Sequence, residues 1–439
     1  MKSFRLLLRC ATVGALILLL LIPLTLVRGV IQERQSYRDM AVRRVSESKA
    51  GAQTFTGPVR VVPWTQIEDT TAFDGDGKRH VERRTVAGYE LQAPRQLKID
   101  GRLVPSERRI GLFRVPVYQW TGRIEADFAA FDYSIKAERT YGTPYLAIGV
   151  SDVRGLAGMP TLRIDGATQA LQAGTKEFAG VSQGIHAPLP VGDTQAGHLP
   201  ALDNLTLQMM LDGTQALSIA PIGDDNKITL HSAWPHPSFG GSFLPYESNI
   251  DAQGFKASWA VSSLASDAQR KLLAPGTGVP ETLQVSLVDP VDVYTQADRA
   301  SKYGILFVLL TFVGFALFEL IKRLPIHPLQ YLLVGLALAI FFLLLIGLSE
   351  HIAFWKAYLV SSTACIGLQL VYLSGVLRSW WRASGFATLL TALYGVLYTL
   401  LASEDNALLM GALLLFGILA VIMWITRKVD WYDLSASLR

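Results

Sequence analysis

The stretch "CATVGALILLLLIPLTLV", Cys10–Val27, contains 18 residues and no charge. An uncharged apolar segment of this kind is long enough to cross the hydrocarbon core of a bilayer as a helix. Lys2, Arg5 and Arg9 precede it, and Arg28 follows it. A cleavable signal peptide has a shorter apolar core and a cleavage site with small residues, and this stretch has neither feature. The sequence therefore predicts an uncleaved transmembrane signal anchor at the N-terminus.

A second apolar part of the chain begins after Lys302 and contains five further runs. They are Tyr303–Ile321, Leu329–Leu348, Ala357–Leu377, Gly385–Ala402 and Ala407–Thr426. Each run is long enough to span a bilayer, so the sequence predicts six transmembrane helices. The predicted domains are an N-terminal signal anchor at residues 1–29, an intervening β-rich domain at residues 30–300 and a five-helix transmembrane domain at residues 301–439.

The short loops between the predicted helices alternate in charge. The loops after the second and fourth helices carry lysine or arginine, whereas those after the third and fifth carry glutamate or aspartate. Loops rich in lysine and arginine remain on the cytoplasmic side of a membrane. This pattern predicts that both termini are cytoplasmic and that residues 30–300 lie outside. The charged loop residues are Lys322, Arg323, Arg378 and Arg382 on the basic side, and Glu350, Glu404 and Asp405 on the acidic side.

The net positive charge of the chain follows from this predicted topology. Residues 30–300 carry 27 Lys/Arg and 30 Asp/Glu, whereas the rest of the chain carries 13 and 6. The excess of positive charge therefore belongs to the membrane part, and it predicts the lipid bilayer and no nucleic acid as a partner. Both cysteines, Cys10 and Cys365, lie in predicted helices. The intervening domain must therefore fold without disulfides.

The intervening domain begins with a helical pattern. Tyr37, Ala41 and Val45 recur every four residues among charged residues. This spacing predicts a helix that continues beyond the first span.

Beyond Gly51 the apolar residues alternate with a period of two, which is typical of strands. Residues 205–234 contain three such strands, with Asp212-Gly213 as one turn, which predicts a β-meander. The predicted fold class is an α+β membrane protein, with a large, mostly antiparallel β domain inserted between the first and second of six transmembrane helices. The string "LKIDG" at residues 97–101 recurs as "LRIDG" at residues 162–166, so two similar β units are the alternative.

The sequence contains no motif that assigns a reaction. It has no G-x-S-x-G, H-E-x-x-H, phosphate-binding loop or dinucleotide fingerprint. None of the seven histidines lies three or four residues from another. His231 and His236 would point to opposite faces of an extended strand, so one metal cannot bind both. We therefore expect a non-enzymatic protein without cofactor or metal.

The densest run of special residues is "WPHPSFGGSFLP" at residues 234–245. Its prolines favour extended backbone and its two glycines permit a reversal. Trp234, Phe239 and Phe243 would bury large rings, and His236 would form a hydrogen bond across the loop. The pattern favours a structural corner. The alternative is a rigid aromatic rim that binds a peptide or a glycan.

Three polar residues lie in or beside the predicted membrane helices. Glu319 is the acidic residue inside a span, and Lys322 and Arg323 can pair with it from the next helical turn. Glu350 and His351 end the third span on the predicted outer side. Local pairing and helix capping are the favoured roles for these groups. Proton transfer is the alternative, because ionisable groups in membranes often carry function.

Several stretches resemble the CreD family of inner membrane proteins, in order from the first span to the C-terminal tail. They are "LLLLIPLTLVRGVIQER", "YLAIGVSDVRGL", "GIHAPLP", "WPHPSFGGSFLP", "DRASKYGILFVLLTFVGFALFEL", "HPLQYLLVGLAL", "LSEH" and "RKVDWY". The resemblance implies a multi-pass protein of a Gram-negative inner membrane that is associated with cell-envelope integrity and with two-component-controlled expression. It implies no catalytic residues.

Two functional hypotheses follow. The first is a non-enzymatic inner-membrane protein whose periplasmic β domain binds or braces an unknown periplasmic envelope component or protein. The second is a membrane transporter or an envelope-modifying enzyme with a site between the helix bundle and the periplasmic domain. That site would use Glu350 and His351, with Glu319 or His236.

Overall fold

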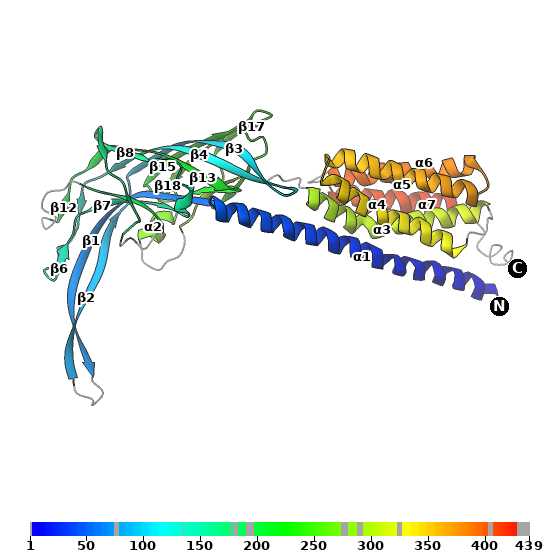
Figure 1. Cartoon of the computed structure of the whole chain (residues 1–439), viewed down its shortest axis with the longest axis horizontal. Coiled ribbons are helices and arrows are strands. Elements are labelled where there is room, and N and C mark those ends of the chain that lie inside the picture. Colours follow the sequence, from blue (N-terminus) through cyan, green and yellow to red (C-terminus); the bar gives the residue numbers. More distant parts are fainter. Residues whose placement is uncertain are drawn as a thin grey trace. The chain divides into compact units, whose positions relative to one another are not determined.

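The computed structural model contains two compact units, Met1–Arg38 with Val291–Arg439, and Asp39–Pro290. Figure 1 shows the ribbon of the whole chain. The structure describes residues 2–73, 79–133, 135–176, 178, 183–189, 197–273, 280–287, 293–322, 327–402 and 407–427.

A single helix, α1 (Lys2–Ser48), contributes residues to both units. The predicted continuation of the helix beyond the first span is therefore confirmed. Ala41 and Val45 are buried, whereas Tyr37 is 43% exposed. The helix therefore presents an apolar stripe in its last turns, as the four-residue spacing indicated.

The unit Asp39–Pro290 is built from two large sheets and one short strand pair. The first sheet has the order β10 (Gln172–Ala173), β11 (Gly184–Pro188), β7 (Tyr145–Val150), β1 (Gln53–Phe73), β14 (Ala216–Ile219), β19 (Leu283–Ser286) and β16 (Ser238–Gly241), and β2 (Arg79–Gln92) and β6 (Arg139–Tyr141) also pair with β1. The second has the order β17 (Glu247–Asp251), β18 (Gly254–Ser262), β15 (Asp225–Ser232), β3 (Gln96–Ile110), β4 (Phe113–Phe128), β13 (Leu202–Thr214), β8 (Thr161–Ile164) and β9 (Ala167–Gln169). The short pair is β12 (His198–Leu199) with β5 (Phe131–Asp132), and the helical segments are η1 (Val153–Gly155) and α2 (Ala268–Leu273).

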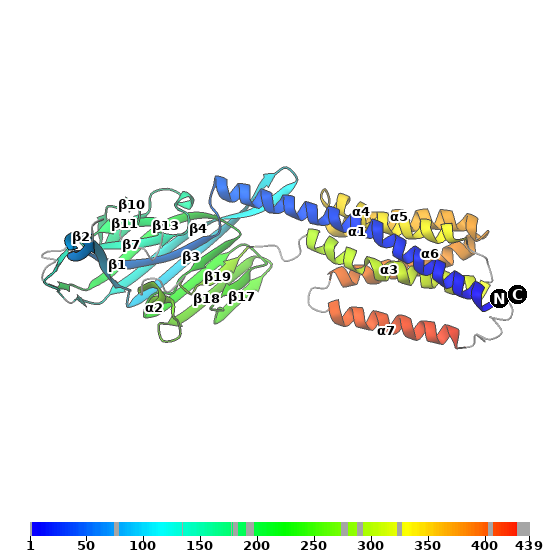
Figure 2. The ribbon, with the colours of Figure 1, turned by 90° about the horizontal axis from the view of Figure 1, so that it is seen from below.

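The two large sheets share one hydrophobic core, so they form a sandwich (Figure 2). Alternate residues of β3 and β13 are buried, which is the period-two pattern of strands with one face on a core. Phe55 of β1 meets Trp120 of β4 across the core, with ring centroids 5.5 Å apart. Gly101 and Gly122 flank the Trp120 indole, and a Cβ at either glycine would come within 2.5 Å of it. The large ring therefore requires small neighbours.

The predicted β-meander is wrong, although its strands exist. β13 pairs with β4 and β8, β14 pairs with β1 and β19, and β15 pairs with β18 and β3. Three consecutive strands therefore alternate between the two sheets. Asp212-Gly213 lies inside β13, and residue 213 must be glycine there, because a Cβ would collide with the Tyr118 side chain. The reversal follows at Gln215, whose φ is 64°.

The sheets are mixed, with two parallel strand pairs among antiparallel ones. β1 runs parallel to β14, and β3 runs parallel to β15. The described strand pairs are mostly antiparallel, as predicted, and the two parallel pairs join strands far apart in the sequence, which no local pattern specifies.

The two similar strings adopt different structures. Asp100-Gly101 lies inside β3. Asp165-Gly166 forms the turn between β8 and β9 with positive φ at both residues. The strings therefore give no structural support for two copies of one β unit.

The other unit contains α1 up to Arg38 and five further helices. These are α3 (Val293–Lys322), α4 (Pro328–Ser349), α5 (Phe354–Val376), α6 (Trp380–Ala402) and α7 (Ala407–Thr426). Among the described residues, four helical segments are long and apolar enough to cross a membrane: Gly14–Ser48, Pro328–Ser349, Phe354–Val376 and Trp380–Leu401. The predicted spans at residues 303–321 and 407–426 lie on α3 and α7, and the six-span topology stays a prediction.

Small residues allow α1 to approach its neighbours in this unit. A Cβ at Gly335 of α4 would lie 2.1 Å from a Leu20 methyl group, and one at Gly304 of α3 would lie 3.2 Å from a Leu24 methyl group. Leu20 and Leu24 are both buried. Close packing through glycine is the usual contact between helices in lipid, where no hydrophobic driving force acts between them.

Candidate functional site

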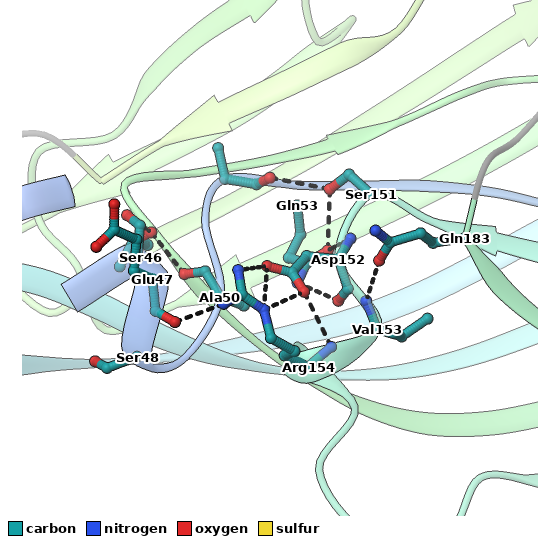
Figure 3. A network of polar contacts seen from close by, with 12 residues as sticks. Ser46, Glu47, Ser48, Ala50, Gln53, Ser151, Asp152, Val153, Arg154 and Gln183 are labelled. Carbon is teal, nitrogen blue, oxygen red and sulfur yellow. Dashed lines mark hydrogen bonds and ion pairs between the residues drawn. The ribbon is translucent and has the colours of Figure 1, made fainter. Parts of the chain in front are cut away.

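A network of polar contacts in the β unit lies where α1 ends and β1 begins (Figure 3). We call it the helix–sheet junction. It comprises Ser46, Glu47, Lys49, Gln53, Asp152, Arg154, Asp212 and Thr214.

Arg154 contacts the last turn of α1 directly. Its Nη1 donates to the Glu47 carbonyl oxygen at 2.5 Å. The last carbonyl groups of a helix lack partners within the helix and carry partial negative charge. A guanidinium at this position satisfies one of them and opposes fraying of the helix end.

Asp152 fixes the Arg154 side chain in this position. The Nη2 and Nε atoms of Arg154 donate to the two carboxylate oxygens at 2.6 and 2.9 Å. The Asp152 side chain also accepts from the Arg154 backbone N–H at 3.0 Å, as the N-cap of η1. The hydrogen bond from the Arg154 side chain holds the pKa of Asp152 below its usual range, against the opposing effect of desolvation. The same bond raises the pKa of Arg154.

Three further contacts connect the end of α1, and the residues that follow it, to β13. Lys49 Nζ forms an ion pair with Asp212 Oδ2 at 2.9 Å. The hydroxyl groups of Ser46 and Thr214 are 3.0 Å apart, and Thr214 Oγ1 also donates to the Ala50 carbonyl oxygen at 2.8 Å. The first residues after the helix are therefore fixed by side chains from another strand.

Gln53 is fully buried at the centre of the junction. Its Nε2 donates to the carbonyl oxygens of Asp152 and Asp212 at 2.9 and 3.2 Å. Its Oε1 accepts from the Ser151 hydroxyl at 3.1 Å and from the Asp152 N–H at 3.3 Å. A buried amide with its groups paired in this way holds three separate segments in one geometry.

An apolar contact completes the junction on the other face of α1. Ala41 and Val45 form a buried cluster with Val115 and Val117 of β4. The last turns of α1 are therefore part of the folded β unit rather than a free linker.

The junction has the composition of a structural joint. The ionisable groups that contact one another are an arginine, a lysine and two aspartates, each engaged in an ion pair. In the described part of the chain, no group of three or more His, Cys, Asp or Glu residues could hold a metal ion. The arrangement can hold a helix and a sheet in a fixed relation and can transmit force between them.

The predicted aromatic stretch lies at the edge of the core. Trp234, Phe239 and Phe243 are partly buried against the main core cluster. Phe239 packs edge-on against Phe255 and Trp259, each with ring centroids 5.7 Å apart.

The side chains of this stretch differ from expectation in two respects. Trp234 keeps partial exposure rather than full burial. His236 is exposed, and its carbonyl oxygen, not its ring, accepts a hydrogen bond, from Trp234 Nε1 at 2.9 Å.

The structure describes the side chains of two of the predicted membrane polar residues, Glu350 and His351. Glu350 is the C-cap of α4, and its Oε1 accepts from the Tyr294 hydroxyl at 3.3 Å and lies 3.4 Å from Arg34 Nε. Its side chain is only 7% exposed. His351 is exposed. Glu319 belongs to α3, but its side chain lies outside the described residues.

Sequence reasoning missed both the junction and the partner of Glu350. Asp152 and Arg154 stand two residues apart directly after β7, a strand with all six residues buried. An acidic and a basic residue at this spacing, at the end of a buried strand, could have indicated an ion pair in the folded protein. Arg34 carries no comparable signal, because it lies far from Glu350 in the sequence.

Two comparisons with known proteins match nearly the whole chain to the same family. A protein-family model described as "Inner membrane protein CreD" matches residues 5–432. A relative described as "Inner membrane protein CreD" from Escherichia coli (strain K12) is 37% identical over 424 residues, which cover 95% of this chain and 92% of the relative.

Similarity to solved structures is weak. A crystal structure of an M1 zinc metallopeptidase from Deinococcus radiodurans has a TM-score of 0.20 and 10% identity, covering 44% of this chain and 41% of that one. A mutant of the same enzyme has a TM-score of 0.18 and 9% identity, covering 44% and 42%. Similarity at this level carries no argument about fold or activity.

Proposed function

The chain belongs to the CreD family of inner membrane proteins, and from this premise we propose that it supports cell-envelope integrity without catalysing a reaction. In this proposal the β unit is periplasmic and binds or braces an envelope component, while the apolar helices anchor it in the bilayer. Both termini are cytoplasmic, in agreement with the charge pattern of the short loops.

The helix–sheet junction is the observation that supports bracing. A helix that contains a candidate span continues to Ser48, and its last turn is held by Arg154, Lys49 and Ser46. A flexible tether would need none of these contacts. A junction of this kind suits a protein that must resist displacement of its outer domain.

The test is the substitution Arg154→Ala, compared with Arg123→Ala as a matched control. Arg123 also pairs with a carboxylate two residues away, Glu125, at 2.8 Å, and its exposure of 59% is close to the 56% of Arg154. The Arg123 side chain pairs with Glu125 of its own strand and not with α1. Both variants are expressed in cells that lack the wild-type protein.

We expect Arg154→Ala to increase amide exchange in the last turn of α1 and to raise envelope permeability to a dye, at an unchanged protein level. Arg123→Ala should leave both measurements unchanged. If Arg154→Ala loosens the helix end but leaves permeability at the wild-type value, bracing through this junction is excluded. If His351→Gln alone abolishes envelope protection, the transporter or enzyme alternative gains support.

A further inference from the structure

A lateral groove opens between α5 and α6 in the helical unit. It has a volume of about 370 Å³. Residues at helical spacing on each helix line it, which places them on facing stripes. Those used below are Trp355, Tyr358, Leu359 and Ile366 of α5, and Gly395 and Tyr398 of α6.

The groove lies within two of the candidate membrane spans, Phe354–Val376 and Trp380–Leu401. From Trp355 to Ile366 it follows the α5 axis for about 16 Å at 1.5 Å per residue. This length is about half of the ~30 Å hydrocarbon core of a bilayer. The groove therefore has the length of one leaflet.

Four of the hydroxyl groups along the groove already have partners in the protein. Tyr358 Oη donates to the Tyr394 carbonyl oxygen at 2.6 Å, and Tyr394 Oη donates to Cys365 Sγ at 3.2 Å. Ser362 Oγ and Thr391 Oγ1 donate to carbonyl oxygens of their own helices, at 3.1 and 2.8 Å. The surface left for an occupant is consequently mostly apolar, which suits hydrocarbon.

The end of the groove near the α4–α5 connection has a different character. The rings of Tyr358 and Tyr398 lie 5.1 Å apart there, and Lys356 Nζ lies 5.4 Å from the centre of the Trp355 ring. Tyrosine and tryptophan are typical of the membrane–water interface. In the described part of the chain, no carboxylate pairs with the Lys356 ammonium, so its charge is available to an anion.

We propose that the α5–α6 groove binds one membrane phospholipid with an anionic headgroup. One acyl chain lies along Leu359, Ile366 and Gly395, and the phosphate region lies at Lys356 beside the aromatic end. The charge of Lys356 selects the anionic headgroup, because the apolar walls alone would accept the chain of a neutral lipid equally well. This proposal is independent of the proposed role of the β unit.

The chain offers a matched pair of groove substitutions. A Cβ at Gly395 meets nothing within 4 Å, so Gly395→Leu fills the groove without a backbone collision. Gly385 of α6 is also open, but it does not line the groove. Leucine has a higher helix propensity than glycine, so both variants should keep α6. Lys356→Gln removes the charge without changing the groove.

The experiment is native mass spectrometry of the full chain, titrated with phosphatidylglycerol or phosphatidylcholine of identical acyl chains. For the wild type we expect the first phosphatidylglycerol to bind about fivefold more tightly, since one lysine near an anionic head contributes ~1 kcal/mol. Lys356→Gln should abolish this preference and leave phosphatidylcholine binding unchanged. Gly395→Leu should weaken both lipids about tenfold, a difference of ~1.4 kcal/mol. Gly385→Leu should bind both lipids as the wild type does.

Three results would overturn the proposal. The first is equal binding of the two lipids by the wild type, which removes the headgroup assignment. The second is equal loss of binding in Gly395→Leu and Gly385→Leu, which shows a general effect of the substitution. The third is unchanged lipid binding in Gly395→Leu with an altered oligomeric state, which assigns the groove to a second copy of the chain.

Discussion

At the scale of single residues, the ionised Asp152 carboxylate is the most informative group of the junction. Its pKa is lowered chiefly by the hydrogen bond from the Arg154 side chain. A lowered pKa in the folded state means that the stabilisation is complete above the unfolded pKa, about 4. It is lost as the pH falls through the lower pKa of the folded state.

Asp152→Asn should therefore show a smaller acid-induced loss of stability than the wild type. The expected difference stays constant above about pH 5 and narrows as the pH falls below about 4, because only the wild type loses an ionised group there. Denaturant unfolding of the full chain in detergent, followed by the β signal in circular dichroism, measures it. A constant difference across this range would show that the ion pair has no role in stability.

Truncation of Trp120 and truncation of Trp234 to alanine should lower the free energy of unfolding by different amounts. Trp120 is 0% exposed in the middle of the sandwich, so Trp120→Ala should destabilise the β unit by about 3–5 kcal/mol. Trp234 is partly exposed, and Trp234→Ala should cost about 1–2 kcal/mol. Unfolding midpoints of the two variants test this order. A larger loss for Trp234 would mean that the aromatic stretch carries a greater structural role than its burial indicates.

At the scale of elements, the connection between η1 and β1 depends on a glycine. A Cβ at Gly155 would lie 2.3 Å from Gln53 Nε2 and 2.4 Å from the Asp212 carbonyl oxygen. The second of these is backbone of β13 and cannot move independently of its strand. The close approach of three segments at this point therefore requires glycine.

Gly155→Ala should accordingly destabilise the β unit by about 1–3 kcal/mol through overpacking. Gly51→Ala is the control, because a Cβ at Gly51 meets nothing within 4 Å. Thermal unfolding and amide exchange at residues 45–53 should change in the first variant alone. Equal stability of both variants would mean that the junction is looser than its hydrogen bonds imply.

At the scale of the whole molecule, reporter fusions test the predicted membrane topology directly. Reporter fusions at Gly57, Asp405 and Arg439 should give periplasmic, periplasmic and cytoplasmic signals, because basic loops remain in the cytoplasm. Fusions with alkaline phosphatase and a fluorescent protein measure both sides. A cytoplasmic signal at Gly57 would place the β unit inside the cell and contradict the proposed function.

Much of the helical organisation could be predicted from the sequence. An uncharged run such as Cys10–Val27 must avoid water along its entire length, and this requirement is visible without knowledge of any neighbour. The extension of α1 to Ser48 follows from the four-residue spacing of Ala41 and Val45. The alternation in β13 likewise revealed which of its faces would be buried, because strand periodicity is a local property.

Only the tertiary structure decided which segments meet. Asp212-Gly213 has the composition of a turn, yet it continues β13 in its pairing with β4, and the glycine is required because Tyr118 occupies the space of a side chain. Arg154 and Glu47 are 107 residues apart in the sequence, and their hydrogen bond exists only because the sheets bring them together. The α5–α6 groove arises in the same way, from the facing stripes of two helices. Sequence periodicity determines which side of an element is buried, whereas its partner depends on packing over the whole chain.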